Sequence, residues 1–184
     1  MSRLPIILLG ALAGALACSD RSWLETSDGP GGFTISFPAS PKIETQVQPS
    51  LASSTTVHTA LLERGSEGNL QVVWYDLPDA AAVPGLPPNL LAGADCNSAF
   101  SDTDLGFTSR SNGPVPVAGR DGVAYTGTAP SSSKHPRGMW EEDRCLVVGR
   151  RLYHLTAVGP DVDEMRATGR RFLGSFSLAP SAGR

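Results

Sequence analysis

Few residues of this chain could do chemistry, and their spacing excludes most of the sites that they could form. The 184-residue sequence contains six residues of the kinds that most often act as nucleophiles or metal ligands: Cys18, Cys96, Cys145, His58, His135 and His154. No two histidines have the short spacing that brings metal ligands together on one helix or across one tight hairpin. We therefore predict no metal site and no cofactor.

Two patterns resemble catalytic motifs, but each has a simpler structural interpretation. Ser131-x-x-Lys134 matches the serine-nucleophile motif of penicillin-recognising enzymes, which needs its serine at the start of a buried helix. Here the motif lies between two prolines in a serine-rich segment, which is typical of a solvated loop. Cys145 and His154 could face each other across a hairpin as a thiol–imidazole pair. We predict no catalytic residue; the alternative is an exported hydrolase that uses Cys145 with His154, or a loop serine.

The N-terminus has the order of a secretory signal. Arg3 supplies a positive charge, Leu4 to Leu16 is apolar, and small residues precede Cys18. The apolar run is too short for a bilayer span, which needs about 20 residues. We therefore assign residues 1–17 to a signal peptide.

Cys18 follows this signal directly, and two kinds of cleavage site could explain it. The residues before it resemble the lipobox of bacterial lipoproteins, with Ala17 in place and Ala15 where leucine is usual. In that case acyl chains such as palmitate would modify Cys18 and hold the protein on a membrane, facing the periplasm or cell surface. Residues 18–32 are polar and rich in glycine, which predicts a flexible tether. The alternative is an ordinary signal-peptidase site, with Cys18 unmodified.

The two remaining cysteines form an even pair in an expected exported domain. Cys96 and Cys145 could therefore form one disulfide. Two free buried thiols are the alternative, since cysteine is often simply a small core residue.

Length and charge limit the class of protein further. A chain of this length fits one domain. With 15 Lys and Arg against 18 Asp and Glu, the net charge is −3. Nucleic acid as a partner is excluded, because it needs clustered positive charge.

Apolar alternation predicts many short strands and two helices within a single domain over residues 33–178, followed by a disordered tail at 179–184. The helices are expected over 89–100 and after Pro160. The strands are expected at 33–37, 42–48, 55–63, 70–77, 108–117, 123–127, 140–148, 152–158 and 175–178. Adjacent hairpins predict a mainly antiparallel α+β domain with two main helices packed on a twisted sheet.

Four motifs carry a resemblance to a known family: Phe33-x-Ile35-x-Phe37-Pro38, Tyr75-Asp76-Leu77-Pro78, Arg151-Leu152-Tyr153-His154-Leu155 and Arg171-Phe172-Leu173-Gly174-Ser175-Phe176. In order and spacing they resemble small exported bacterial proteins of the PsbP-like fold, which also occurs in DcrB-type lipoproteins. The resemblance implies an α/β/α sandwich and a non-catalytic binding or assembly role, and it brings no catalytic residues. Cys96 and Cys145 are not recognised features of that family.

Long connections carry function more often than packed strands do. The two longest are expected at 80–88 and 129–138. An unidentified protein partner would contact residues in or beside these loops: Pro84, Gly85, Leu86, Ser132, Lys134, His135 and Trp140.

Overall fold

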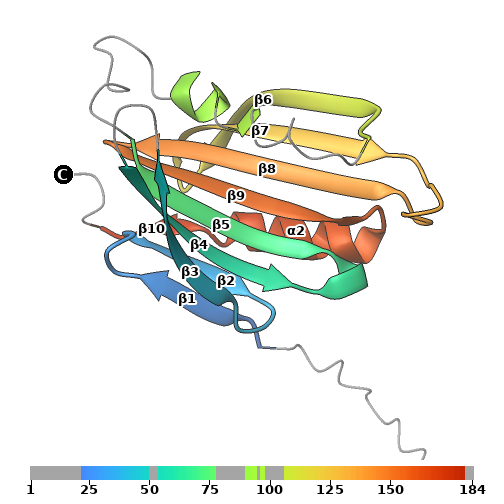
Figure 1. The fold of residues 1–184 in the computed structure, drawn as a ribbon, viewed down its shortest axis with the longest axis horizontal. Coiled ribbons are helices and arrows are strands. Elements are labelled where there is room, and N and C mark those ends of the chain that lie inside the picture. The colour runs from blue at the N-terminus through green and yellow to red at the C-terminus, as the bar shows by residue number, and fades with distance from the viewer. Residues whose placement is uncertain (1–21, 50–53, 78–89, 95, 98–105, 181–184) are drawn as a thin grey trace, which may run out of the picture.

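The computed structural model describes residues 22–49, 54–77, 90–94, 96–97 and 106–180 (Figure 1). The expected signal peptide and Cys18 lie outside these residues. Among the described residues, no helix has both the length and the apolar character needed to cross a bilayer.

The described residues form ten strands in two antiparallel sheets. The strands are β1 (Leu24–Asp28), β2 (Phe33–Phe37), β3 (Lys42–Pro49), β4 (Ser54–Glu63), β5 (Asn69–Asp76), β6 (Ser109–Val117), β7 (Arg120–Ala129), β8 (Met139–Val148), β9 (Arg151–Pro160) and β10 (Ser177–Leu178). The large sheet has the order β3-β4-β5-β9-β8-β7-β6, and the small sheet has the order β1-β2-β10. A short 3-10 turn, η1 (Gly65–Glu67), joins β4 to β5.

The positions of the strands follow from their sequences. β9 lies at the centre of the large sheet, and it is apolar along most of its length because both of its faces are covered. β6 lies at one edge, as its two prolines, Pro114 and Pro116, predict. β2 alternates buried and half-buried residues, so only one of its faces packs inward.

One long helix and the small sheet cover the same face of the large sheet (Figure 1). The helix α2 (Asp163–Gly174) packs against β9, β8 and β2. Its buried residues recur at helical spacing and form one inward stripe: Met165, Gly169, Phe172 and Leu173. Acidic residues in its first turn and Arg171 in its last turn complement the helix dipole.

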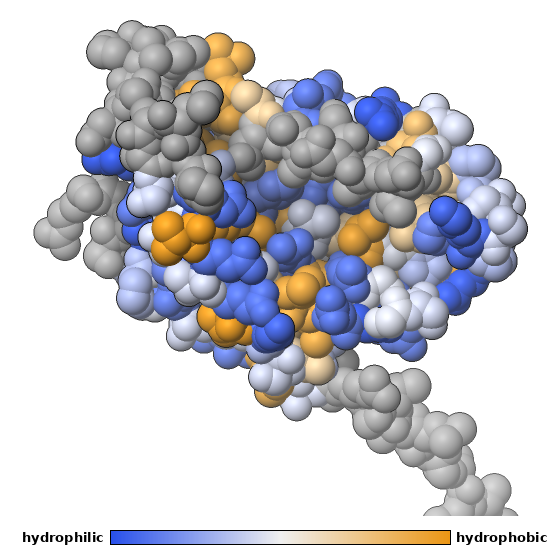
Figure 2. All heavy atoms as spheres, in the orientation of Figure 1, coloured by the Kyte–Doolittle hydropathy of each residue, from blue (hydrophilic) through white to orange (hydrophobic). Residues whose placement is uncertain are grey.

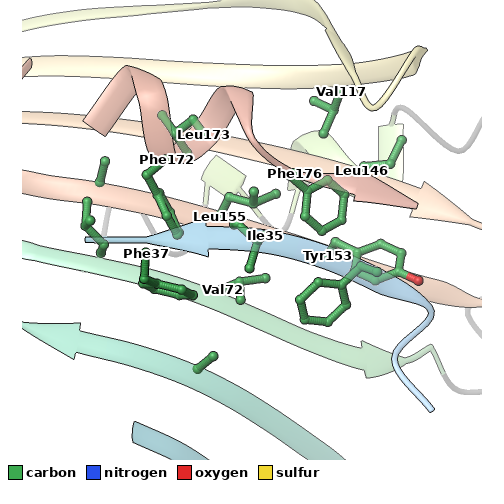
Figure 3. Close-up of a cluster of buried hydrophobic side chains, with 14 of the residues drawn as sticks. Ile35, Phe37, Val72, Val117, Leu146, Tyr153, Leu155, Phe172, Leu173 and Phe176 are labelled. Carbon is green, nitrogen blue, oxygen red and sulfur yellow. The ribbon is translucent and has the colours of Figure 1, made fainter. Parts of the chain in front are cut away.

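The main core lies between these layers (Figure 3). Phe172 of α2 points toward Phe37 of β2, with ring centroids 4.9 Å apart. At the other end of the cluster, the rings of Tyr153 and Phe176 are 5.4 Å apart. These aromatic contacts join both sheets and the helix into one core.

The predicted architecture of two main helices on one sheet is wrong. α2 is the single long helix among the described residues, and residues 90–94 and 96–97 form only a short helical segment. That sequence contains Gly93 and Asn97, which are weak helix formers. Beside α2, on the same face of the large sheet, the small antiparallel sheet occupies part of the layer that was expected to be helical.

The small sheet uses residues that the sequence analysis assigned to the tether. Leu24–Asp28 forms β1 and pairs with β2 over five residues, from Leu24 opposite Phe37 to Asp28 opposite Phe33. The final strand β10 pairs with the other edge of β2. The ordered structure thus begins before Phe33.

Gly169 lies where α2 packs tightly against the large sheet. A Cβ atom at this position would lie 2.7 Å from Cζ3 of Trp140 and 2.9 Å from Cβ of Ala157. We expect Gly169→Ala to lower the free energy of unfolding by about 1–3 kcal/mol through overpacking. Gly174→Ala is a matched control in the same helix, because no atom lies within 4 Å of its Cβ position. Equal effects of the two substitutions in denaturant titrations would contradict this packing.

A polar clamp fastens the turn between β1 and β2 to the large sheet. Arg151 forms two hydrogen bonds to the carboxylate of Asp76, at 2.8 and 3.0 Å, and donates another to the carbonyl of Pro30. The hydroxyl of Tyr153 donates to the carbonyl of Gly31 at 2.7 Å. The hydrogen bond from Arg151 holds the pKa of Asp76 below its ordinary value.

Because this pKa is lowered on folding, Asp76 contributes stability above its unfolded pKa of about 4, and that contribution is lost as the pH falls through the folded value. We expect Asp76→Asn to be less stable than the wild type at pH 7. In urea titrations the difference should begin to shrink near pH 4 and should continue to shrink as the pH falls through the folded pKa of Asp76. In an Arg151→Gln background the difference should lose its dependence on pH. A wild-type advantage that stays constant down to pH 3 would contradict the clamp.

Candidate functional site

The second face of the large sheet carries the residues that the sequence analysis singled out for thiol–imidazole chemistry. A two-residue turn at Gly149 and Arg150 joins β8 to β9 and sets their register. Gly149 has a φ of 60°, a conformation that glycine adopts readily. This register places Cys145 directly opposite His154.

The predicted pairing of Cys96 with Cys145 is confirmed. The two residues form a disulfide with their Cα atoms 5.8 Å apart, and both are fully buried. Around the bond, Ala92, Val147 and Leu152 complete a small apolar cluster. The disulfide therefore fastens the helical residues around Cys96 to β8, on the face opposite α2.

A buried carboxylate–imidazole pair, formed by Asp143 and His154, lies beside the disulfide. Oδ1 of Asp143 is 3.1 Å from Nε2 of His154 and accepts a hydrogen bond of 2.6 Å from the hydroxyl of Thr156. The exposed fractions of Asp143 and His154 are 1% and 7%. Within the described part of the chain, Oδ2 of Asp143 has no hydrogen-bond partner. Glu141, also buried, lies two residues before Asp143 on the same face of β8.

The two sulfurs lie close to His154, but the disulfide limits their reactivity. The two sulfurs and one ring nitrogen of His154 all lie within 4.8 Å of one another. While the disulfide is intact, neither sulfur is a thiolate, which is the form that attacks substrates or binds metals. The structure therefore does not support the alternative of a hydrolase that uses Cys145 with His154.

The predicted contact residues differ in their exposure to solvent. Ser132 and Lys134 are exposed in the loop between β7 and β8, where the backbone N–H of His135 donates to the hydroxyl of Ser132 at 3.1 Å. Trp140 is fully buried beneath Gly169 of α2, so it is a core residue. Three predicted contact residues lie outside the described residues: Pro84, Gly85 and Leu86.

The described surface also has a small pocket beside α2. A pocket of about 70 Å³ lies between Arg64 and the start of α2, but a typical small-molecule site exceeds about 300 Å³. Arg64 is already paired with Glu67 at 2.7 Å. On the face shown in Figure 2, apolar side chains are interspersed with hydrophilic ones and do not gather into one patch.

The roles of Asp143 and Thr156 were not predicted from the sequence, although a signal was present. In a hairpin with a two-residue turn at Gly149 and Arg150, any two residues equally distant from the turn are opposite each other. The same rule that pairs Cys145 with His154 also pairs Asp143 with Thr156.

Comparison with protein-family models and with the sequences of curated proteins gave no match. Among solved structures, the chain is similar to cyanobacterial PsbP (CyanoP) from Synechocystis sp. PCC 6803. The TM-score is 0.50 at 17% sequence identity, and the similarity covers 92% of this chain and 98% of that one. The chain therefore has a PsbP-like fold.

Proposed function

We propose that this chain is an exported, membrane-anchored bacterial lipoprotein whose PsbP-like domain acts as a non-catalytic binding or assembly module. The observation that carries the proposal is the buried disulfide between Cys96 and Cys145. Disulfides persist in oxidising compartments outside the cytoplasm, in agreement with the signal expected at residues 1–17. The bond also uses both cysteines of the folded domain and leaves Cys18 for lipid attachment.

The same bond supports a non-catalytic role. It removes the strongest potential nucleophile of the chain from reaction. The other catalytic-like motif, Ser131-x-x-Lys134, has both named residues exposed in the loop between β7 and β8. Neither residue has the buried helical setting that the serine-nucleophile mechanism needs.

Metabolic labelling with a palmitate analogue tests the anchor. The wild-type chain should take up label and sediment with membranes, whereas Cys18→Ser should do neither. A Cys96→Ser/Cys145→Ser variant is the matched control and should remain labelled. Unlabelled wild-type protein, or a Cys18→Ser variant that keeps the label, would rule out this anchor.

Site-specific photocrosslinking in the native membrane tests the binding role. A crosslinking residue at Lys134, in the exposed loop between β7 and β8, should capture a discrete protein partner. The same residue at Lys42, whose side chain is 73% exposed on β3, is the control position and should capture much less. Equal capture at both positions, or none at either, would count against a contact surface in this loop.

A further inference from the structure

We infer that Cys96, Cys145 and His154 form a buried site for a zinc-like divalent metal ion when their disulfide is reduced. The disulfide and the metal would then be alternative states of one site. The proposal goes beyond a binding module and does not depend on the acylation of Cys18. It begins from the convergence of two sulfurs and one imidazole nitrogen within 4.8 Å.

The donor set and its spacing suit zinc. Two thiolates and one imidazole are common zinc ligands, with Zn–S distances of about 2.3 Å and Zn–N distances of about 2.0 Å. A tetrahedral site with these bond lengths holds its ligand atoms roughly 3–4 Å apart. Once the bond between Cys96 and Cys145 is broken, the two sulfurs must separate, and they start close enough to His154 for a metal to enter between the three.

Asp143 supplies the second observation. A histidine that binds a metal usually hydrogen-bonds to a carboxylate, which orients the ring and raises its basicity. Asp143 contacts Nε2 of His154 at 3.1 Å and is itself held by Thr156, so the metal would bind through the other ring nitrogen, Nδ1. It is a positioning residue for the metal ligand.

The second oxygen of Asp143, Oδ2, is a further observation that favours a ligand at this site. Oδ2 is buried and has no hydrogen-bond partner among the residues that the structure describes. A buried carboxylate oxygen left in this state is costly and calls for an explanation. The fourth position of a zinc ion with three protein ligands usually holds water, and such a water would be a donor for Oδ2.

The chemistry balances with a dithiol as the reductant. The dithiol gives two electrons and two protons to the disulfide, becomes a disulfide itself, and leaves Cys96 and Cys145 as thiols. Metal binding then releases the two thiol protons, because the thiolate is the ligand. The sulfurs are fully buried, so the reductant would reach them by local opening around Cys96.

The test uses the full chain with Cys18→Ser, so that Cys96 and Cys145 are its only cysteines. The protein is reduced without oxygen, freed of reductant and titrated with Co²⁺, an optical probe for zinc sites. The reduced protein should bind one Co²⁺ with the visible bands of tetrahedral coordination and a thiolate charge-transfer band, and Zn²⁺ should displace it. The oxidised protein and reduced Cys145→Ser should lack these bands.

Two further variants separate the site from general metal binding. Asp143→Asn should raise the Kd for Co²⁺ by about 10- to 100-fold while the charge-transfer band remains, because the thiolates are unchanged. His58→Ala is the matched control on β4, where His58 lies 3.0 Å from the hydroxyl of Thr45 and 5.3 Å from the ring of Trp74. It should bind Co²⁺ as the parent protein does.

Several results would overturn the inference. Equal Co²⁺ binding by the oxidised and reduced proteins would place the metal elsewhere, and so would unchanged binding by His154→Ala. Circular dichroism is recorded throughout, because reduction could also unfold the domain. A reduced chain that loses its sheet signal and does not recover it with Zn²⁺ has no such site.

Discussion

Replacing Cys96 and Cys145 together with alanine is expected to lower the free energy of unfolding by about 4 kcal/mol. The disulfide joins residues 49 positions apart, and a crosslink over a loop of that length greatly restricts the unfolded chain. It also ties the helical residues around Cys96 to β8, where the surrounding buried cluster is small. Equilibrium denaturation in guanidinium chloride, followed by the sheet signal, measures the effect.

The control is Cys18→Ala, which removes the one cysteine that is not part of the disulfide. It should leave the denaturation midpoint unchanged. Cys145→Ala alone should resemble the double variant, since one missing partner already abolishes the bond. A loss below about 1 kcal/mol in the double variant would mean that the unfolded chain gains little freedom without the crosslink.

Phe172→Ala is expected to lower the free energy of unfolding by about 3–5 kcal/mol. Phe172 is fully buried and packs against Phe37, so it joins α2 to β2. Truncation to alanine removes the transfer free energy of the ring and leaves a cavity between close-packed layers. Thermal and chemical denaturation of the variant should both show the loss.

Arg170→Ala is the matched control, because Arg170 is an exposed residue of the same helix. Its effect should stay within about 0.5 kcal/mol. If the two substitutions cost similar amounts, α2 does not pack through Phe172 as described.

Local patterns predicted the individual elements well. The apolar run on either side of Gly149 and Arg150 predicted the hairpin of β8 and β9, and the acidic start after Pro160 predicted α2. These predictions depend on residues close together in the chain, where turn chemistry and helix capping act. The alternation of Phe33, Ile35 and Phe37 likewise predicted β2 with its observed bounds.

The arrangement of the elements was harder to predict. β1 reads Leu-Glu-Thr-Ser-Asp and has little apolar pattern, because most of it is exposed. β1 is a strand because it pairs with β2, and this pairing is not visible in the sequence of β1 itself. The same holds for β10, whose two residues pair with β2 from the far end of the chain. The prediction of a single sheet was wrong because it could not include these long-range strand pairs, which form the small sheet.

The candidate site depends partly on local sequence patterns and partly on the tertiary arrangement. The pairing of Cys145 with His154 follows from the hairpin register and was available from the sequence. The position of Cys96 could not be predicted, because it depends on a tertiary contact that brings Ala92 and Cys96 against the second face of the sheet. The buried state of Asp143 depends on that same tertiary arrangement.

The two prolines of β6 have a consequence for the domain at high concentration. Proline has no backbone N–H, and strands accept it where that group would point away from the neighbouring strand. Pro114 and Pro116 lie opposite Val123 and Asp121 in β7, so the missing donors belong to the open side of the edge. A strand arriving from another copy would find two donors absent and could not extend the sheet there. Molecules crowded side by side would therefore resist joining through this edge into aggregates.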